Sequence, residues 1–303
     1  MTLAVVFPGQ VFDADLMAEA LHPFDGDPLV GALAEMLGTD DWAGLDCIDA
    51  SIAGPCTLVA GLLTARQQLD RSTVAATAGH SFGEITALTY AGVLGDLDAI
   101  RIVARRGKLS RLASKDRAGT MAAVVGLTPS EVDWDRRATI SETGEILEFA
   151  AMNDSQQNVL TGDDRAVHQV MDRAVEAGAV VAELPIPGAY HSPLMYPAVD
   201  DLAGYLAGMT FGPLEIPVFS AIDGIAHDDP EDFRTLVPRG LVLPVRWREA
   251  MTAMVAAGVT DVADAGPGEV LRRLGRRHRK LKFRRLIADT VAQAVPVVPV
   301  VPV

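Results

Sequence analysis

The stretch from Gly79 to Glu84, GHSFGE, contains the residue whose surroundings most clearly indicate chemistry. Ser81 lies between two glycines, after an apolar run and before a segment with helical apolar spacing. This pattern is typical of a serine nucleophile on a sharp turn between a strand and a helix. Such a serine can accept an acyl group, but the turn alone does not indicate whether water or another acceptor then removes it.

A serine hydroxyl is a weak nucleophile at neutral pH and needs a base within hydrogen-bonding reach. Among the six histidines, His191 follows an expected strand and a Pro-Gly turn and opens a helix, where a loop presents a side chain at a sheet edge. His80 adjoins Ser81, and neighbouring side chains on a tight turn point apart. We expect surface or helix-face roles for the other four, which are His22, His168, His227 and His278.

Acyl transfer also needs two N–H donors that stabilise the negatively charged oxygen of the intermediate. The residue after the nucleophile usually supplies one, here Phe82. The loop Phe7–Gln10 (FPGQ) is placed to supply the other if it is not a simple β-turn, because parallel strand ends gather at one sheet edge. Arg106 can bind a carboxylate through two parallel hydrogen bonds, although its spacing alone favours a solvated helix residue.

Apolar runs at residues 3–7 and 73–81 predict strands of one sheet. Helical spacing follows at four segments, which are 28–37, 54–69, 82–94 and 97–114. Alternation of strand and helix indicates a parallel sheet with helices on both faces. Beyond His191 we expect helix, strand, helix, strand and a final basic helix.

Between residues 119 and 186 the lengths and order of the expected strands and helices change. Short strands are expected at 120–127, 145–153, 157–162 and 179–186, with a helix at 164–178. They fit a small α+β insert of the split-βαβ kind. We therefore predict a discontinuous large domain (1–118 and 187–290) and a small subdomain (119–186). The Val/Pro-rich tail 291–303 is expected to be extended and poorly ordered.

The composition narrows the class of protein. The chain has 303 residues and a net charge of −14, which argues against nucleic acid or an anionic membrane as a partner. No apolar run approaches the ~20 residues of a membrane span, and the N-terminus resembles a strand rather than a secretory signal. We therefore expect a soluble, cytoplasmic protein. Cys47 and Cys56 have no disulfide or metal-site spacing and are expected to pack in the core.

Segment 272–285, RRLGRRHRKLKFRR, has nine Lys or Arg residues and no acid. It indicates either a site for an anionic partner or a solvated basic helix face.

Together these residues resemble the malonyl-CoA:acyl carrier protein transacylases and the acyltransferase domains of polyketide synthases. The resemblance extends almost end to end, through FPGQ, GHSFGE, ARRGKLS, GTMAAVVG, MNDSQQNVLTG, YHSPLM, LPVRW and AGPGEVL. It implies an α/β-hydrolase-like core with an inserted ferredoxin-like subdomain. It also implies a Ser81–His191 dyad, with His191 oriented by the backbone carbonyl of Leu243 and an oxyanion hole made by the N–H groups of Gln10 and Phe82.

The implied reaction is ping-pong transfer of a malonyl group from malonyl-CoA to Ser81 and then to the phosphopantetheine thiol of an acidic acyl carrier protein. No metal or permanently bound cofactor is implied. Arg106 would bind the free malonyl carboxylate, and the bulky Tyr190 favours malonyl over methylmalonyl. Three departures leave the acyl specificity more open than the reaction, namely Val11 for glycine, Gly54 for glutamine and Ala221 for asparagine.

An acidic enzyme would repel an acidic carrier unless it presented a positive patch. We therefore expect some residues of the basic segment to help dock the carrier or the phosphates of coenzyme A, with the candidates being Arg272, Arg273, Arg276, Arg277, Arg279 and Lys280. Other functions stay open, including a serine hydrolase or editing thioesterase, a transferase using another acyl donor such as a substituted malonyl-CoA or an acyl-carrier protein, and a catalytically idle docking module. The sequence does not indicate the pathway or the oligomeric state.

Overall fold

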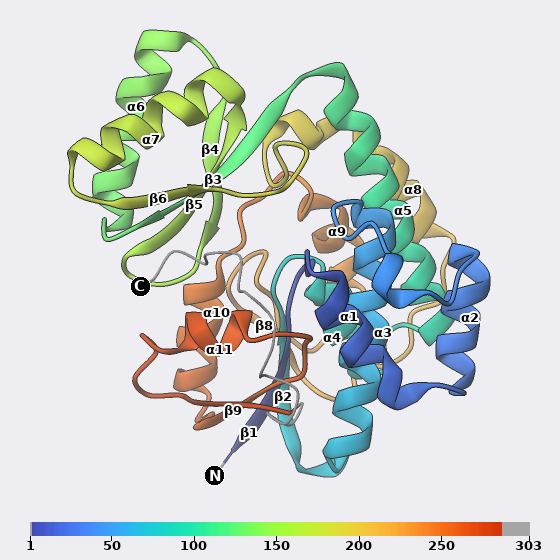
Figure 1. Ribbon diagram of the computed structural model, residues 1–303. Coiled ribbons are helices and arrows are strands. Elements are labelled where there is room, and N and C mark those ends of the chain that lie inside the picture. The colour runs from blue at the N-terminus through green and yellow to red at the C-terminus, as the bar shows by residue number, and fades with distance from the viewer. Residues whose placement is uncertain (1, 287–303) are drawn as a thin grey trace.

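A computed structural model describes residues 2–286 and contains two sheets (Figure 1). The larger sheet has the strand order β10-β9-β1-β2-β7-β8, and β8 alone is antiparallel to its neighbour. Its strands are β1 (Leu3–Phe7), β2 (Val74–Gly79), β7 (Val218–Phe219), β8 (Ala226–His227), β9 (Asp261–Asp264) and β10 (Lys282–Arg285). The predicted parallel sheet is therefore confirmed, with β1 and β2 at its centre.

Helices cover both faces of this sheet (Figure 1). From β1 the chain adds β2 and then β7 toward one edge of the sheet, whereas from β9 it adds β10 toward the other edge. Because crossovers between parallel strands are right-handed, the two directions place their helices on opposite faces. One group comprises α1 (Ala14–Leu21), α2 (Pro28–Leu37), α3 (Ala50–Gln68), α4 (Gly83–Tyr90), α5 (Asp96–Asp116), α8 (Val199–Ala207) and α9 (Asp232–Arg239). The opposite face carries α10 (Trp247–Ala256) and α11 (Val270–Gly275).

Short 3-10 helices connect several of these elements, at His22–Phe24, Trp42–Gly44, Arg71–Thr73 and Pro193–Ala198. Helix α3 is apolar on nearly all sides, because it is enclosed by other helices and the sheet. It carries Gly54 into the core beside α4 and α5, a position that matters for the site below.

The smaller sheet is antiparallel, with the order β4-β5-β3-β6. Its strands are β3 (Gly119–Val125), β4 (Leu147–Met152), β5 (Gln157–Asp163) and β6 (Val180–Glu183), and α6 (Pro129–Thr143) and α7 (Asp164–Glu176) pack on it. This β-α-β-β-α-β order agrees with the expected split-βαβ insert. The domain limits at residues 119 and 186 stay a prediction, and the predicted tail 291–303 lies outside the described residues.

The prediction of one basic helix for segment 272–285 was wrong. Helix α11 ends at Gly275, and Lys282–Arg285 forms the edge strand β10, parallel to β9. Phe283 packs on Gly275 so closely that a Cβ there would lie 2.3 Å from the ring. The alternation of apolar and charged residues from Leu281 to Arg284 is the strand pattern that competes with helical spacing.

None of the helices within residues 2–286 has the length and apolar character that crossing a membrane requires.

Candidate active site

The turn that carries Ser81 is compressed between β2 and α4. Gly79 ends the strand and Gly83 begins the helix, and a Cβ on Gly79 would lie 1.9 Å from the backbone of Gly83. A Cβ on Gly83 would lie 2.1 Å from the carbonyl oxygen of Phe7. Ser81 itself has a left-handed φ of 54°. Only glycines fit on either side of this serine, and the strained turn projects it from the sheet edge.

The Ser81 hydroxyl and the His191 imidazole form a hydrogen bond, with 2.7 Å between Oγ and Nε2. The other ring nitrogen of His191, Nδ1, lies 3.0 Å from the carbonyl oxygen of Leu243. Because a carbonyl can only accept, Nδ1 carries the proton and Nε2 is left to accept from Ser81. His80 has a different partner, since its Nε2 lies 2.9 Å from Asn153 Oδ1. The hydrogen-bond partner of Ser81 is therefore His191 and not His80.

His191 is nearly fully buried, and burial is the main reason that its pKa falls to about 3; the positive charge of Arg106 lowers it further. The imidazole is therefore neutral at physiological pH, as a general base must be.

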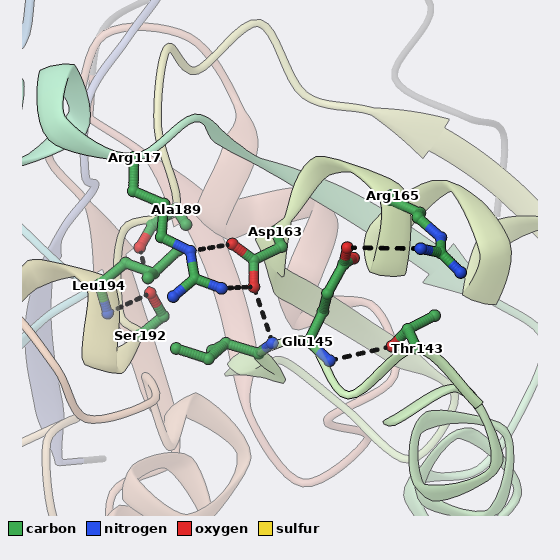
Figure 2. Close-up of polar contacts among 9 residues, drawn as sticks. Arg117, Thr143, Glu145, Asp163, Arg165, Ala189, Ser192 and Leu194 are labelled. Atoms are coloured by element: carbon green, nitrogen blue, oxygen red, sulfur yellow. Dashed lines mark hydrogen bonds and ion pairs between the residues drawn. The ribbon is translucent and has the colours of Figure 1, made fainter. Parts of the chain in front are cut away.

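The loop that carries His191 is fixed by its own hydrogen bonds. The Ser192 hydroxyl donates to the carbonyl of Ala189 at 2.6 Å and accepts from the N–H of Leu194 at 3.2 Å (Figure 2). Residue 191 between them has a left-handed φ of 61°. Ser192 is fully buried, so these bonds hold the strained conformation.

Hydrogen bonds tie the small sheet to the rest of the protein. Arg117 donates two hydrogen bonds of 2.5 Å to Asp163, at the end of β5 (Figure 2). At β4, the N–H of Val245 donates to Ala150 at 2.8 Å, and Val245 accepts from the N–H of Met152 at 2.9 Å. Val245 lies two residues after Leu243, so the small sheet supports the segment that orients the histidine.

The loop after β1 lies against the serine turn. A Cβ on Gly9 would lie 3.1 Å from the carbonyl oxygen of His80 and 3.5 Å from Ser81 Cβ. The Gln10 side chain turns away and donates to the carbonyls of Cys47 and Ile48 at 2.8 and 3.0 Å. Within residues 2–286 no backbone carbonyl accepts from the N–H groups of Gln10 or Phe82. Both donors are therefore available beside the nucleophile.

Arg106 lies on α5 and is 5% exposed. Burial lowers its pKa to about 10, and nearby Tyr190 and Glu84 act in the opposite direction. Arg106 forms no ion pair within the described residues, and its buried Nη1 has no hydrogen-bond partner there. A buried cation without an anion is costly, so this guanidinium is prepared to receive one.

A pocket joins these groups. It is lined by Ser81, His191 and Arg106 together with Glu84 from α4, and by residues between Ala221 and Val245. Its chemistry fits an acyl group that reacts at the serine while its far end carries a negative charge.

Known proteins are similar to this chain in sequence and fold. Residues 66–299 match the family model described as acyl transferase domain. The chain belongs to the acyl transferase domain family. A curated malonyl CoA-acyl carrier protein transacylase of Escherichia coli (strain K12) is 33% identical over 288 residues, covering 90% of this chain and 92% of the relative.

Solved structures of the family agree with the fold. An acyl-carrier-protein S-malonyltransferase of Burkholderia pseudomallei 1710b has a TM-score of 0.85 and 30% identity, and the match covers 94% of this chain and 96% of the other. A complex of a type II PKS acyl-carrier protein with its malonyl-transacylase has a TM-score of 0.84 and 30% identity, with coverage of 94% and 96%.

Glu84 is a residue of this acyl transferase that the sequence analysis did not assign. It is buried, one carboxylate oxygen accepts from the N–H of Ala221 at 3.2 Å, and the other has no partner among residues 2–286. Burial raises its pKa to about 7. The one available signal was an acidic residue inside an otherwise apolar helix.

The residues that depart from the family pattern are all buried. Val11 packs in the core with no left-handed φ, so the loop tolerates it without strain. Ala221 lines the pocket, and Gly54 lies beside Phe82. Tyr190 is also buried, close enough for Arg106 to influence its pKa, which burial raises to about 12. Tyr190 is not among the residues that line the pocket.

The six predicted docking residues do not form one exposed patch. Three are exposed and unpaired within the described residues, which are Arg276, Arg279 and Lys280. The other three pair with acids: Arg272 and Arg273 with Glu269, and Arg277 with Asp154 at 3.2 Å. We call residues 276–280 the basic loop. It adjoins the site, because His278 Nε2 lies 3.2 Å from the carbonyl oxygen of Asn153, the partner of His80.

The remaining histidines and the cysteines have no place in the pocket. His22 and His168 are exposed, as predicted. The surface role expected for His227 was wrong, because its side chain is 10% exposed and lies between Asp223 and Asp232. Both cysteines are buried, as expected of packing residues. Within residues 2–286 no group of His, Cys, Asp and Glu is arranged to hold a metal ion.

Proposed function

We propose that this acyl transferase moves a malonyl group from malonyl-CoA to the phosphopantetheine thiol of an acyl carrier protein, through an ester on Ser81. The observation that carries the proposal is Arg106, a buried cation without an anion in the pocket that holds the Ser81–His191 pair. A malonyl thioester supplies a carboxylate beyond the reactive carbonyl, whereas no carboxylate of the described residues, Glu84 included, lies within ion-pair distance of Arg106. The printed names of the relatives, malonyl CoA-acyl carrier protein transacylase and malonyl-transacylase, support it.

In the first half-reaction, Nε2 of His191 takes the proton of Ser81 as Oγ attacks the thioester carbonyl. The N–H groups of Gln10 and Phe82 stabilise the oxyanion. The carbon–sulfur bond then breaks, and His191 returns the proton to the coenzyme A sulfur. In the second half-reaction, His191 takes the proton of the carrier thiol, the sulfur attacks the ester, and Ser81 recovers its proton.

Leu243 has a positioning role, because the bond from His191 Nδ1 to its carbonyl fixes the tautomer that leaves Nε2 as acceptor. It also stabilises the imidazolium that forms transiently. The contact uses the backbone, so the Leu243 side chain is not needed for it.

Arg106 selects the acyl group. An acyl chain without a carboxylate leaves the guanidinium buried and unpaired, at a cost of about 3–5 kcal/mol by comparison with broken buried ion pairs. The basic loop adds a positive edge for the acidic carrier or for the phosphates of coenzyme A. No permanently bound cofactor is required, and a cytoplasmic location stays a prediction.

The test is to incubate the protein with malonyl-, methylmalonyl- and acetyl-CoA and to weigh the acyl-enzyme by intact mass spectrometry. We expect a malonyl adduct that Ser81→Ala abolishes, with less methylmalonyl and acetyl adduct. An adduct that persists in Ser81→Ala, or equal acetyl and malonyl adducts, would contradict the proposal. Loss of the malonyl adduct to water within seconds would indicate a hydrolase instead.

A further inference from the structure

The side chain of Phe82 lies directly against Arg106. The guanidinium carbon Cζ is 3.9 Å from the centroid of the Phe82 ring, and both residues are 5% exposed. The proposed function uses only the backbone N–H of Phe82 and leaves its ring without a role. A desolvated contact between a cation and an aromatic face is among the stronger contacts of this kind.

The contact matters because Arg106 forms no ion pair in the pocket, and the carboxyl of Glu84 acts on its pKa only from a greater distance. No described carboxylate lies within ion-pair distance of it. The negative face of an aromatic ring partly compensates a buried positive charge. The 3.9 Å distance is short enough for stacking, and a guanidinium that stacks on a ring keeps its in-plane N–H groups available for a ligand. Nη1 of Arg106 has no partner among the described residues.

The ring of Phe82 packs beside Gly54 of α3. A Cβ on Gly54 would lie 3.5 and 3.6 Å from two ring atoms of Phe82 and 2.6 Å from Val103 Cγ1. A larger side chain on α3 would therefore have to displace Val103 or the ring. The ring of Phe82 therefore packs between Gly54 on α3 and Arg106 on α5.

We propose that Phe82 is a positioning residue for substrate selection: its ring, seated on Gly54, holds the Arg106 guanidinium in the orientation that receives the acyl carboxylate. This inference rests on the proposed function, because it specifies how the same site distinguishes acyl groups. Phe82 acts through Arg106 and not through the bond that is made or broken.

The test compares wild type, Phe82→Leu and Phe82→Tyr, alone and in an Arg106→Ala background. The readout is the ratio of malonyl to acetyl adduct formation, so that any change common to both donors cancels. With Arg106 present, Phe82→Leu should lower this ratio about tenfold by raising the half-saturating malonyl-CoA concentration, whereas Phe82→Tyr keeps the ring and should keep most of the ratio. In the Arg106→Ala background, Phe82→Leu should leave the ratio unchanged.

Two results would overturn the inference: an unchanged ratio in Phe82→Leu, or an equal fall of the ratio with and without Arg106. If Phe82→Leu does not fold, as judged by urea unfolding, Phe82→Met provides the same comparison with a more flexible side chain. Failure of the proposed function is a separate result that the wild type alone shows, because it would then form no malonyl adduct or would form acetyl and malonyl adducts equally.

Discussion

Replacing Arg106 by methionine should stabilise the ligand-free protein and at the same time remove its preference for malonyl. Burial lowers the pKa of this guanidinium to about 10, two to three pH units below its ordinary value. At about 1.4 kcal/mol per pH unit, keeping the charge buried costs roughly 3 kcal/mol at neutral pH. The ring of Phe82 offsets about 1–2 kcal/mol of this cost. Arg106→Met should therefore raise the free energy of unfolding by about 1–2 kcal/mol.

The dependence of this stability difference on pH follows from the proton that Arg106 binds in the folded and unfolded states. The folded protein holds this proton less tightly than the unfolded chain does, so the penalty is complete below pH 10 and fades only as the pH rises above it. Urea unfolding at pH 7 measures the effect. Arg105→Met is the matched control, since Arg105 is an exposed neighbour on α5 that lies 4.7 Å from the Tyr205 ring centroid. The free energy of unfolding of Arg105→Met should lie within about 0.5 kcal/mol of the wild-type value.

Arg106→Met should also lose the difference of about 3–5 kcal/mol between the binding free energies of the malonyl and acetyl groups. This loss corresponds to a fall in selectivity of at least about a hundredfold. A variant that is less stable than wild type would refute the reasoning, because it would mean that Arg106 already has a partner in the free protein. A variant that is more stable but still selects malonyl would refute the role of Arg106 in binding the carboxylate.

Three further predictions concern pH and docking. Because burial lowers the pKa of His191 to about 3, acylation by acetyl-CoA should keep its rate from pH 7 to pH 5; a tenfold fall would indicate an ordinary imidazole. Burial raises the pKa of Glu84 to about 7, so folding takes up a proton and stability is lost as the pH rises from about 4.5 through 7. Glu84→Gln should therefore be more stable than wild type in urea by about 1–3 kcal/mol at pH 8 and equal to it near pH 4; equal differences at both pH values would argue against a buried carboxyl. Charge reversal of the three exposed cations of the basic loop should raise the KM for carrier protein about tenfold and flatten its salt dependence, whereas Arg137→Glu on α6 should do neither; two unchanged values would exclude docking there.

The sequence predicted the parts of this site that depend on local backbone geometry. Ser81 was identified because a strand-to-helix turn of this kind requires glycines at fixed positions, and the structure shows the contacts that exclude a Cβ. His191 could be selected because it follows an expected strand and a Pro-Gly turn and precedes a helix, where a loop presents a side chain at a sheet edge. Both arguments need only the order of elements along the chain.

The contacts that tune the site could not be predicted in this way. The ring of Phe82 meets Arg106 and Gly54 only because α3, α4 and α5 pack together, and no spacing along the chain encodes such a contact. Glu84 was overlooked for the same reason, since its burial depends on the segment at Ala221, far away in sequence.

Local signals in the sequence indicate two elements that the prediction did not place, helix α6 and strand β10. Helix α6 begins with a capping box, in which Thr128 and Glu131 bond reciprocally, followed by a proline at its first turn. Apolar periodicity does not indicate helix α6, because its apolar face is weak. The basic segment was interpreted as a helix because charge dominated its composition, whereas alternation from Leu281 onward marks the edge strand.

The most direct test of the central claim is a chase of the acyl-enzyme. The protein is first acylated with labelled malonyl-CoA, separated from the donor, and then mixed with a phosphopantetheinylated acyl carrier protein or with buffer alone. The account predicts that the label moves from Ser81 to the carrier thiol within seconds and stays on Ser81 for minutes or longer in buffer. Release of the label as free malonate at the same rate in both mixtures would contradict it, because Ser81 would then serve hydrolysis.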